Sequence, residues 1–255
     1  MDKKTQCIII GGGHSVTEGL NKDLWNKISN KFTVGCNYSY RYYNSTLLCF
    51  IDNDFYEQEF INLSNLELIV GKCSLKNTHP NTIAIPHTNE YNRGLTKGIY
   101  GALTGVYALS LAIYLLDVGE IFMLGMDFGA KSNDIKCPIK LKEITYKGNI
   151  LTAPRFIVSK SEGKLSRPLT HWYQDELEHR GVGQIGYYYI KDKVTNVFKA
   201  FEGETKCKIY NVGLDSRIEQ FEKISYDSFF SKLDNEVYNQ EELVREIRGK
   251  LSGLI

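Results

Sequence analysis

The chain has 255 residues, of which 42% are apolar and 24% are charged, and its formal net charge at pH 7 is +1. This composition is typical of a globular protein and is too apolar for an intrinsically disordered one. The nearly neutral charge gives no global electrostatic sign of nucleic acid or anionic membrane as a partner.

The chain contains no uninterrupted apolar stretch of about 18 residues, the length that a membrane-spanning helix needs. Its N-terminus, MDKKTQ, leads directly into an apolar run and not into the core of a signal peptide. We therefore expect no transmembrane segment and a cytoplasmic location. The six cysteines are scattered without a CxxC pair, so we interpret them as reduced core residues.

The first half of the chain alternates short apolar runs with helix-like stretches. The runs are rich in β-branched and aromatic residues and end in turn formers, which is typical of strands. We expect strands at 7–11, 31–37, 46–52, 66–72 and 81–86. Several of them are apolar throughout, as in a parallel sheet that is buried on both faces. Residues 16–29 and 54–63 fit crossover helices, so this half has the rhythm of βαβ units.

The next unit is GIYGALTGVYALSLAIYLLDVGEIFMLGMDF, residues 98–128. It predicts a long apolar helix that stops at Gly119, followed by a buried strand that ends near Asp127. Small residues at the start of the helix, among them Thr104 and Gly105, allow another backbone or a ligand to approach closely. The unbonded amides of a helix N-terminus also suit phosphate.

After residue 128 the alternation of strands and helices stops. Residues 129–170 mix charged and apolar residues with Gly and Pro, and 143–151 predict a hairpin. A segment of this length inside a compact domain predicts an inserted lid or an acceptor-binding subdomain. The strand 206–213 and an amphipathic helix at about 235–252 complete the chain. We predict an α/β fold in which residues 1–255 form one Rossmann-like domain with a mainly parallel sheet flanked by helices.

The glycine-rich turn after the first strand matches no standard nucleotide motif. In GGGHSVTEG, Thr17 stands where the GxGxxG fingerprint needs its third glycine, and no GK[ST] follows as in a Walker loop. The turn still offers backbone amides and the Ser15 hydroxyl at the start of a helix. A structural turn and an anion-binding turn both remain open.

Polar residues follow several of the predicted strands. Asn37, Asp52 and Asp127 come at strand ends, and Asn211 lies near the end of the last one. Ligands of open α/β sheets bind at the carboxyl ends of the strands, so we expect these side chains to share one crevice. The predicted nucleotide-binding residues are Gly11, Gly12, Gly13, Ser15, Asn37, Asp52, Thr104, Gly105 and Asp127.

Several segments together resemble the bacterial sialyltransferases of glycosyltransferase family 42. These are, in order, IIIGGGHS, FTVGCNYSYRYY, LLCFIDNDFYEQ, LTGVYALSLAIYLLDVGEIFMLGMDF and KIYNVGLDS. Motility accessory factor proteins and archaeal-type hydroxymethylpterin pyrophosphokinases have the same landmarks. The resemblance covers roughly residues 5–128 and 170–225, and it implies a nucleotide-sugar donor.

The resemblance also implies roles for individual residues. Gly11, Gly13 and Ser15 would hold the phosphate and ribose of the donor, Asn37 would hydrogen-bond the nucleotide sugar, and Thr104 with Gly105 would line the donor pocket. A histidine after the insertion would be the general base on the acceptor hydroxyl, with His179 the better match and His171 the next.

Two departures from the family pattern leave the donor open between a CMP-sugar and a UDP-sugar. The family has Asn-Gly-Pro-Ser where this chain has Gly12-Gly13-His14-Ser15, and an aromatic residue where this chain has Gly129. The acceptor stays open among a glycan, a protein and a modified nucleic-acid base, as does assembly into a homo-oligomer.

A second group of residues supports a different chemistry. Asp52-Asn53-Asp54 has the DxD spelling with which many glycosyltransferases hold a divalent metal. Because the family that the chain resembles works without metal, we expect none, and Mg or Mn at Asp52 and Asp54 is the alternative. Two more functions stay open. One is a pyrophosphokinase-like transferase on a small heterocycle, with magnesium held by Asp52, Asp54 and Asp127, and the second is a non-catalytic nucleotide-binding module.

Overall fold

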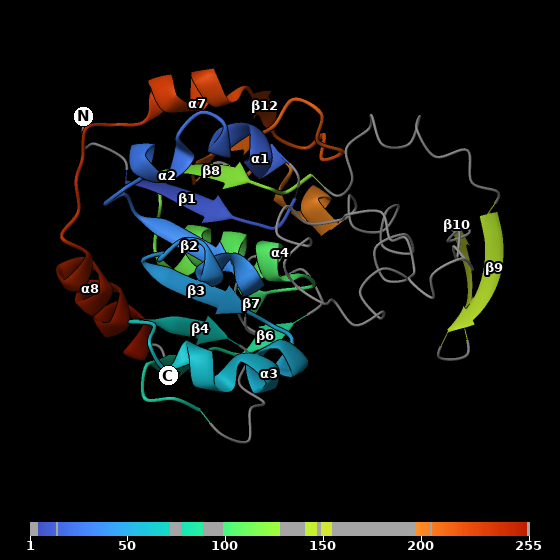
Figure 1. Ribbon diagram of the computed structural model, residues 1–255, viewed down its shortest axis with the longest axis horizontal. Coiled ribbons are helices and arrows are strands. Elements are labelled where there is room, and N and C mark those ends of the chain that lie inside the picture. Colours follow the sequence, from blue (N-terminus) through green and yellow to red (C-terminus); the bar gives the residue numbers. More distant parts are fainter. Residues whose placement is uncertain are drawn as a thin grey trace.

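The protein is built on one parallel sheet. A computed structural model describes residues 5–13, 15–71, 78–88, 99–127, 141–146, 149–154, 197–204 and 206–253. Its eight-stranded sheet has the order β12-β11-β8-β1-β2-β3-β4-β5, and every neighbouring pair is parallel (Figure 1). The strands are β1 (Gln6–Ile10), β2 (Thr33–Cys36), β3 (Leu47–Phe50), β4 (Ile69–Gly71), β5 (Thr82–Ala84), β8 (Glu120–Leu124), β11 (Lys208–Val212) and β12 (Glu222–Ile224). The predicted Rossmann-like α/β fold is therefore confirmed.

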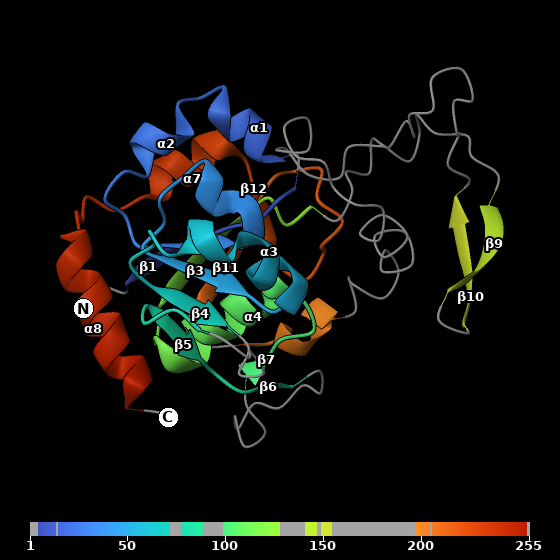
Figure 2. The same cartoon turned by 60° about the horizontal axis from the view of Figure 1, so that its bottom comes forward.

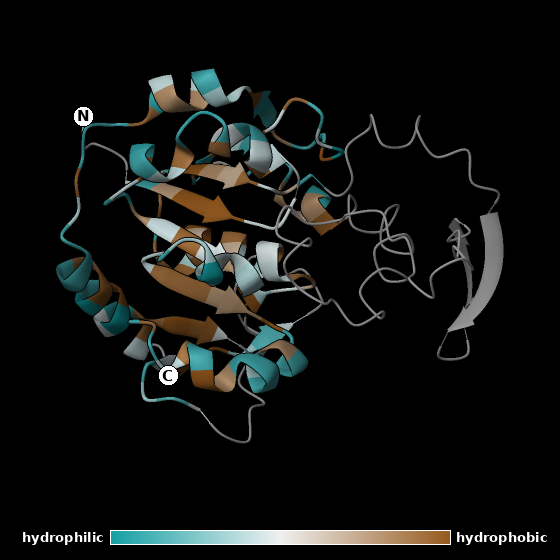
Figure 3. Cartoon of the chain, viewed as in Figure 1, coloured by the Kyte–Doolittle hydropathy of each residue, from teal (hydrophilic) through white to brown (hydrophobic). Residues whose placement is uncertain are grey.

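Both faces of the sheet are buried, because alternate side chains of apolar strands point to opposite sides. Ile9 of β1 lies in the core on one face, together with Val34 of β2 and Leu47 of β3. Ile8 and Ile10 lie in the core on the other face. Figure 3 shows the resulting apolar colour along the central strands. Cysteines 7, 36 and 49 are buried thiols on β1, β2 and β3, as expected for the strands that carry them.

Helices cover each face. The helices are α1 (Ser15–Leu20), α2 (Leu24–Lys27), α3 (Asn53–Leu63), α4 (Thr104–Ser110), α7 (Tyr226–Lys232) and α8 (Gln240–Ser252). The face of Ile8 packs against α1, α2 and α7, which lie side by side in Figure 2. The opposite face packs against α4 and the apolar side of α8.

The structure corrects three boundaries that the sequence predicted. The helix expected at 16–29 is two short helices, because Asp23 adopts a left-handed conformation with φ of 64° between them. The long helix begins only at Thr104, after the short strand β7 (Ile99–Tyr100), and continues from α4 into η2 (Leu111–Leu115), a π-helical segment. The last helix starts at Gln240, where the Asn239 side chain accepts a hydrogen bond from the Glu242 amide.

Several short elements complete the described part of the chain. They are η1 (Asn37–Arg41), β6 (His87–Thr88), which pairs with β7, the hairpin of β9 (Leu141–Tyr146) and β10 (Asn149–Pro154), and η3 (Lys199–Phe201). The hairpin confirms the one predicted within the insertion. The remainder of 129–170, predicted to be a lid, lies outside the described residues. No helix in the described ranges has the length and apolarity needed to cross a bilayer.

The strand order reverses beside β1. From β1 the chain builds β2 to β5 on one side, and then returns to place β8, β11 and β12 on the other. The reversal therefore lies between β1 and β8. In open parallel sheets this switch point leaves a crevice at the carboxyl edge, where ligands bind.

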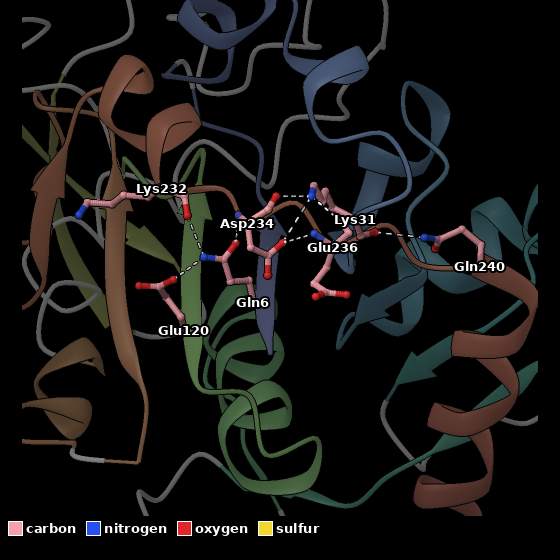
Figure 4. A network of polar contacts seen from close by, with 7 residues as sticks. All are labelled: Gln6, Lys31, Glu120, Lys232, Asp234, Glu236 and Gln240. Atoms are coloured by element: carbon pink, nitrogen blue, oxygen red, sulfur yellow. Dashed lines mark hydrogen bonds and ion pairs between the residues drawn. The ribbon is translucent and has the colours of Figure 1, made fainter. Parts of the chain in front are cut away.

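The opposite edge of the sheet is covered by the segment that joins α7 to α8. The Gln6 side chain donates to Glu120 Oε2 and to the Lys232 carbonyl, and its Oε1 accepts from the Asp234 amide at 2.9 Å. The Lys31 ammonium donates to the carbonyls of Asp234 and Glu236 (Figure 4). These contacts fix the C-terminal segment at the amino edge and leave the carboxyl edge as the side for a site.

Candidate functional site

The glycine turn is bonded to a carboxylate from the neighbouring strand. Asp127 follows β8 and is 4% exposed. Its Oδ2 accepts a hydrogen bond from the Ser15 amide at 2.7 Å, and its Oδ1 accepts one from the Ser15 hydroxyl at 2.5 Å. The Gly125 amide in turn donates to the Ser15 hydroxyl oxygen at 3.2 Å. A buried carboxylate thus neutralises the amide end of α1, where negative charge is favourable.

Close packing around this carboxylate requires glycine at position 13. A Cβ on Gly13 would lie 2.4 Å from Asp127 Oδ2 and 2.7 Å from the Gly125 carbonyl oxygen. Gly125 has φ of +65° and turns the chain between β8 and Asp127. The turn is therefore shaped around Asp127. The pKa of Tyr226 on α7 is raised, first by burial and second by the negative charge of Asp127. The Tyr226 ring packs on Gly19 of α1.

A second pair of predicted site residues meets at the end of β2. The Thr104 hydroxyl at the start of α4 donates to Asn37 Oδ1 at 3.3 Å. Asn37 is half-buried and has φ of 50°, a left-handed conformation that asparagine tolerates better than most residues. Leu103 precedes α4 without a side-chain cap. The Asn37–Thr104 pair therefore places a carboxamide beside the amides of the first turn of α4.

Met126 lies between the two pairs. A Cβ on Gly11 would lie 2.9 Å from its methyl carbon, and a Cβ on Gly105 would lie 2.6 Å from the same atom. Gly105 is predicted to let another backbone or a ligand approach closely, and the family resemblance implies that Gly11 holds the phosphate and ribose of the donor. In the structure the Met126 side chain lies against both glycines. No pattern in the sequence singled out Met126, although its place two residues after the buried strand β8 was a usable signal.

Asn211, another strand-end residue, fixes a loop at this edge. Its Nδ2 donates to Ser216 Oγ at 2.7 Å, and Ser216 Oγ donates to the Met126 carbonyl at 3.0 Å. The Arg217 amide donates to the Asp127 carbonyl at 3.0 Å. The loop after β11 therefore lies across the end of β8. Asn211 is fully buried, so this contact gives it a structural role.

The acidic pair after β3 is separate from these contacts. Asp52 and Asp54 are both exposed at the start of α3, and Asp52 makes no side-chain cap of that helix. Within the described part of the chain, no three His, Cys, Asp or Glu side chains are grouped closely enough to hold a metal ion. Asp52 contributes to the charge near Tyr38, whose pKa is raised first by burial and then by Glu59.

A charged cluster supports the segment that follows Asn37. Arg41 donates two hydrogen bonds at 2.6 Å to the carboxylate of Glu59, which also accepts from the Tyr40 hydroxyl and, at 3.1 Å, from Asn62. Burial acts to raise the pKa of Glu59, but these hydrogen bonds outweigh it and lower the pKa below its usual value. Burial and the bond with Glu59 raise the pKa of Tyr40 to about 12. The cluster ties η1 to α3 and so fixes the backbone next to Asn37.

Both histidines predicted to act as a base, His179 and His171, lie outside the described residues. Of the histidines that the structure describes, His79 stacks on Phe60 of α3, and His87 packs edge-on to Tyr107 of α4. The structure thus brings Gly13 and Ser15 to Asp127, and Asn37 to Thr104. It leaves Asp52 at the exposed end of β3, and Gly12 half-buried in the turn.

The chain matches no known protein-family model, and no curated protein sequence matches it significantly. The resemblance to the sialyltransferase family therefore rests only on the sequence segments that carry it, and membership of that family stays an expectation.

Proposed function

We propose that the chain is a glycosyltransferase that transfers a sugar from a CMP-sugar or a UDP-sugar to an acceptor hydroxyl. The observation that carries this proposal is the Asn37–Thr104 pair, which lies at the carboxyl edge of a parallel sheet whose order reverses one strand away from β2, between β1 and β8. This is the edge at which folds of this class bind nucleotides. The segments that contain Asn37 and Thr104 are also those that most resemble the family.

The chemistry needs two kinds of group. Departure of the nucleotide builds negative charge on its phosphate, which backbone amides at a helix start can stabilise. The amides of the first turn of α4, next to Asn37, fit this need. Attack by the acceptor needs a base whose pKa lies near the working pH, and a histidine meets that condition with little tuning. We assign this role to His179, with His171 as the alternative.

Hydrolysis of the donor in the absence of acceptor tests the reaction class. We expect the purified chain to release CMP from a CMP-sugar or UDP from a UDP-sugar slowly, at the same rate with and without EDTA. Thr104→Val, which removes the hydroxyl and keeps the shape, is expected to slow the release, and Glu57→Gln on the exposed side of α3 serves as the control. Release that EDTA abolishes favours the alternative in which Asp52 and Asp54 hold Mg or Mn. No release from either donor class contradicts the proposal.

A further inference from the structure

The glycine turn is the part of the switch point where phosphate is usually bound in folds of this kind. In this chain the side chain of Asp127 occupies that position. The Ser15 amide and hydroxyl bond to the two oxygens of Asp127 at 2.7 and 2.5 Å, so an anion from solution meets donors that are already in use. Residue 127 is 4% exposed, which leaves it little access to water.

The sequence around the turn fits this internal carboxylate closely. Gly13 lacks a Cβ where one would lie 2.4 Å from Asp127 Oδ2, and at Gly213 a Cβ would lie 2.9 Å from Ser15 Cβ and 3.7 Å from Asp127 Oδ1. The Arg217 amide holds the Asp127 carbonyl at 3.0 Å. Contacts from two segments that are distant in the sequence, the glycine turn and the loop after β11, therefore fix Asp127 from different sides.

We propose that Asp127 occupies the anion position of the glycine turn and excludes phosphate from it, so that the donor's phosphate binds on the Asn37–Thr104 side of Met126. Like charges at short range repel strongly where water is largely excluded. A phosphate at the turn would have to displace a carboxylate that two hydrogen bonds hold. Asp127 is thus a positioning residue that determines how the donor is oriented. The statement about the donor rests on the proposed function, whereas the exclusion of phosphate from the turn does not.

The test observes the turn directly in the 255-residue chain labelled with nitrogen-15. The amide resonances of Gly13 and Ser15 are followed while inorganic phosphate is added at pH 7, with sodium chloride keeping the ionic strength constant. In the wild type we expect no saturable shift of Ser15. In Asp127→Ala, which removes the carboxylate and frees the Ser15 amide and hydroxyl, we expect a saturable shift of Ser15 as phosphate is added.

A saturable Ser15 shift in the wild type would overturn the inference, and so would an Asp127→Ala variant that is folded and as unresponsive as the wild type. If that variant does not fold, the wild-type phosphate titration decides alone. A third titration, with CMP or UMP, concerns the donor: shifts at Asn37, Thr104 and Gly105 without Ser15 support the orientation, and shifts at Ser15 contradict it. A wild type that binds no nucleotide refutes the proposed function. The exclusion of phosphate from the glycine turn is then still decided by the phosphate titrations alone.

Discussion

Thr104 donates a hydrogen bond from its hydroxyl to Oδ1 of Asn37 at 3.3 Å, across 67 residues of sequence. If this pair holds the donor, Asn37→Ala and Thr104→Val are each expected to weaken nucleotide binding by about tenfold, because one hydrogen bond contributes about 0.5–1.5 kcal/mol and its remaining partner loses that bond. Calorimetry on both variants and on the double variant measures the coupling. Strict additivity of the two losses would show that the residues act separately.

The close approach of Gly13 to Asp127 predicts a stability effect. Gly13→Ala would put a Cβ 2.4 Å from Asp127 Oδ2. We expect it to lower the free energy of unfolding by about 1–3 kcal/mol, as overpacking does, when measured by urea unfolding. The matched control is Gly249→Ala in the exposed part of α8, where a Cβ would meet nothing within 4 Å. That change is expected to stabilise by about 0.5–1 kcal/mol. Equal effects at the two positions would contradict the packing around Asp127.

The Glu59 cluster predicts a dependence of stability on pH. The pKa of Glu59 in the folded protein is lowered by hydrogen bonds that outweigh burial, so it lies below the value of about 4.3 in the unfolded chain. The contribution of the Glu59 carboxylate to the free energy of unfolding is therefore complete above the unfolded pKa. It is lost as the pH falls through the lowered pKa of the folded protein. Urea unfolding between neutral and acid pH should show this loss in the wild type and not in Glu59→Gln. Glu57→Gln, on the exposed side of the same helix, is the control. If the free energy of unfolding depends on pH in the same way in the wild type and in Glu59→Gln, Glu59 does not cause the loss of stability at acid pH.

The fold followed from local patterns, and the contacts of the site did not. Runs such as those of β1 and β3 are apolar and short, so their strand character is visible in the sequence. The break at Asp23 was missed because a left-handed residue inside a helical pattern leaves no periodic sign. Asp127 was correctly placed at a strand end. Its bond to Ser15, 112 residues earlier, depends on β8 lying next to β1, and no local rule predicts that pairing.

Gly105 is a second residue whose contacts could not be predicted from the local sequence. A small residue at a helix start indicates close approach of something, and the sequence alone does not distinguish a ligand from a side chain of the protein. In the folded chain it is the Met126 side chain that comes within 2.6 Å of the position of a Cβ.

The proposed base can be tested by substitution. His179→Ala is expected to reduce sugar transfer by about 10² to 10⁴ and to leave nucleotide affinity nearly unchanged, because a base acts on the acceptor and not on the donor. His171→Ala in the same assay is the comparison. A larger loss for His171→Ala would exchange the two assignments. If neither change matters and EDTA abolishes transfer, the metal alternative at Asp52 and Asp54 replaces both.

Calorimetric titration of the wild-type chain with CMP, UMP, UDP, GMP and AMP tests most directly whether this chain binds a nucleotide at the Asn37–Thr104 pair. We predict saturable binding of a cytidine or uridine nucleotide, and binding about tenfold weaker in Thr104→Val, since the hydroxyl joins Asn37 to the start of α4. Absence of saturable binding to any of the five nucleotides at millimolar concentration would contradict the proposed function.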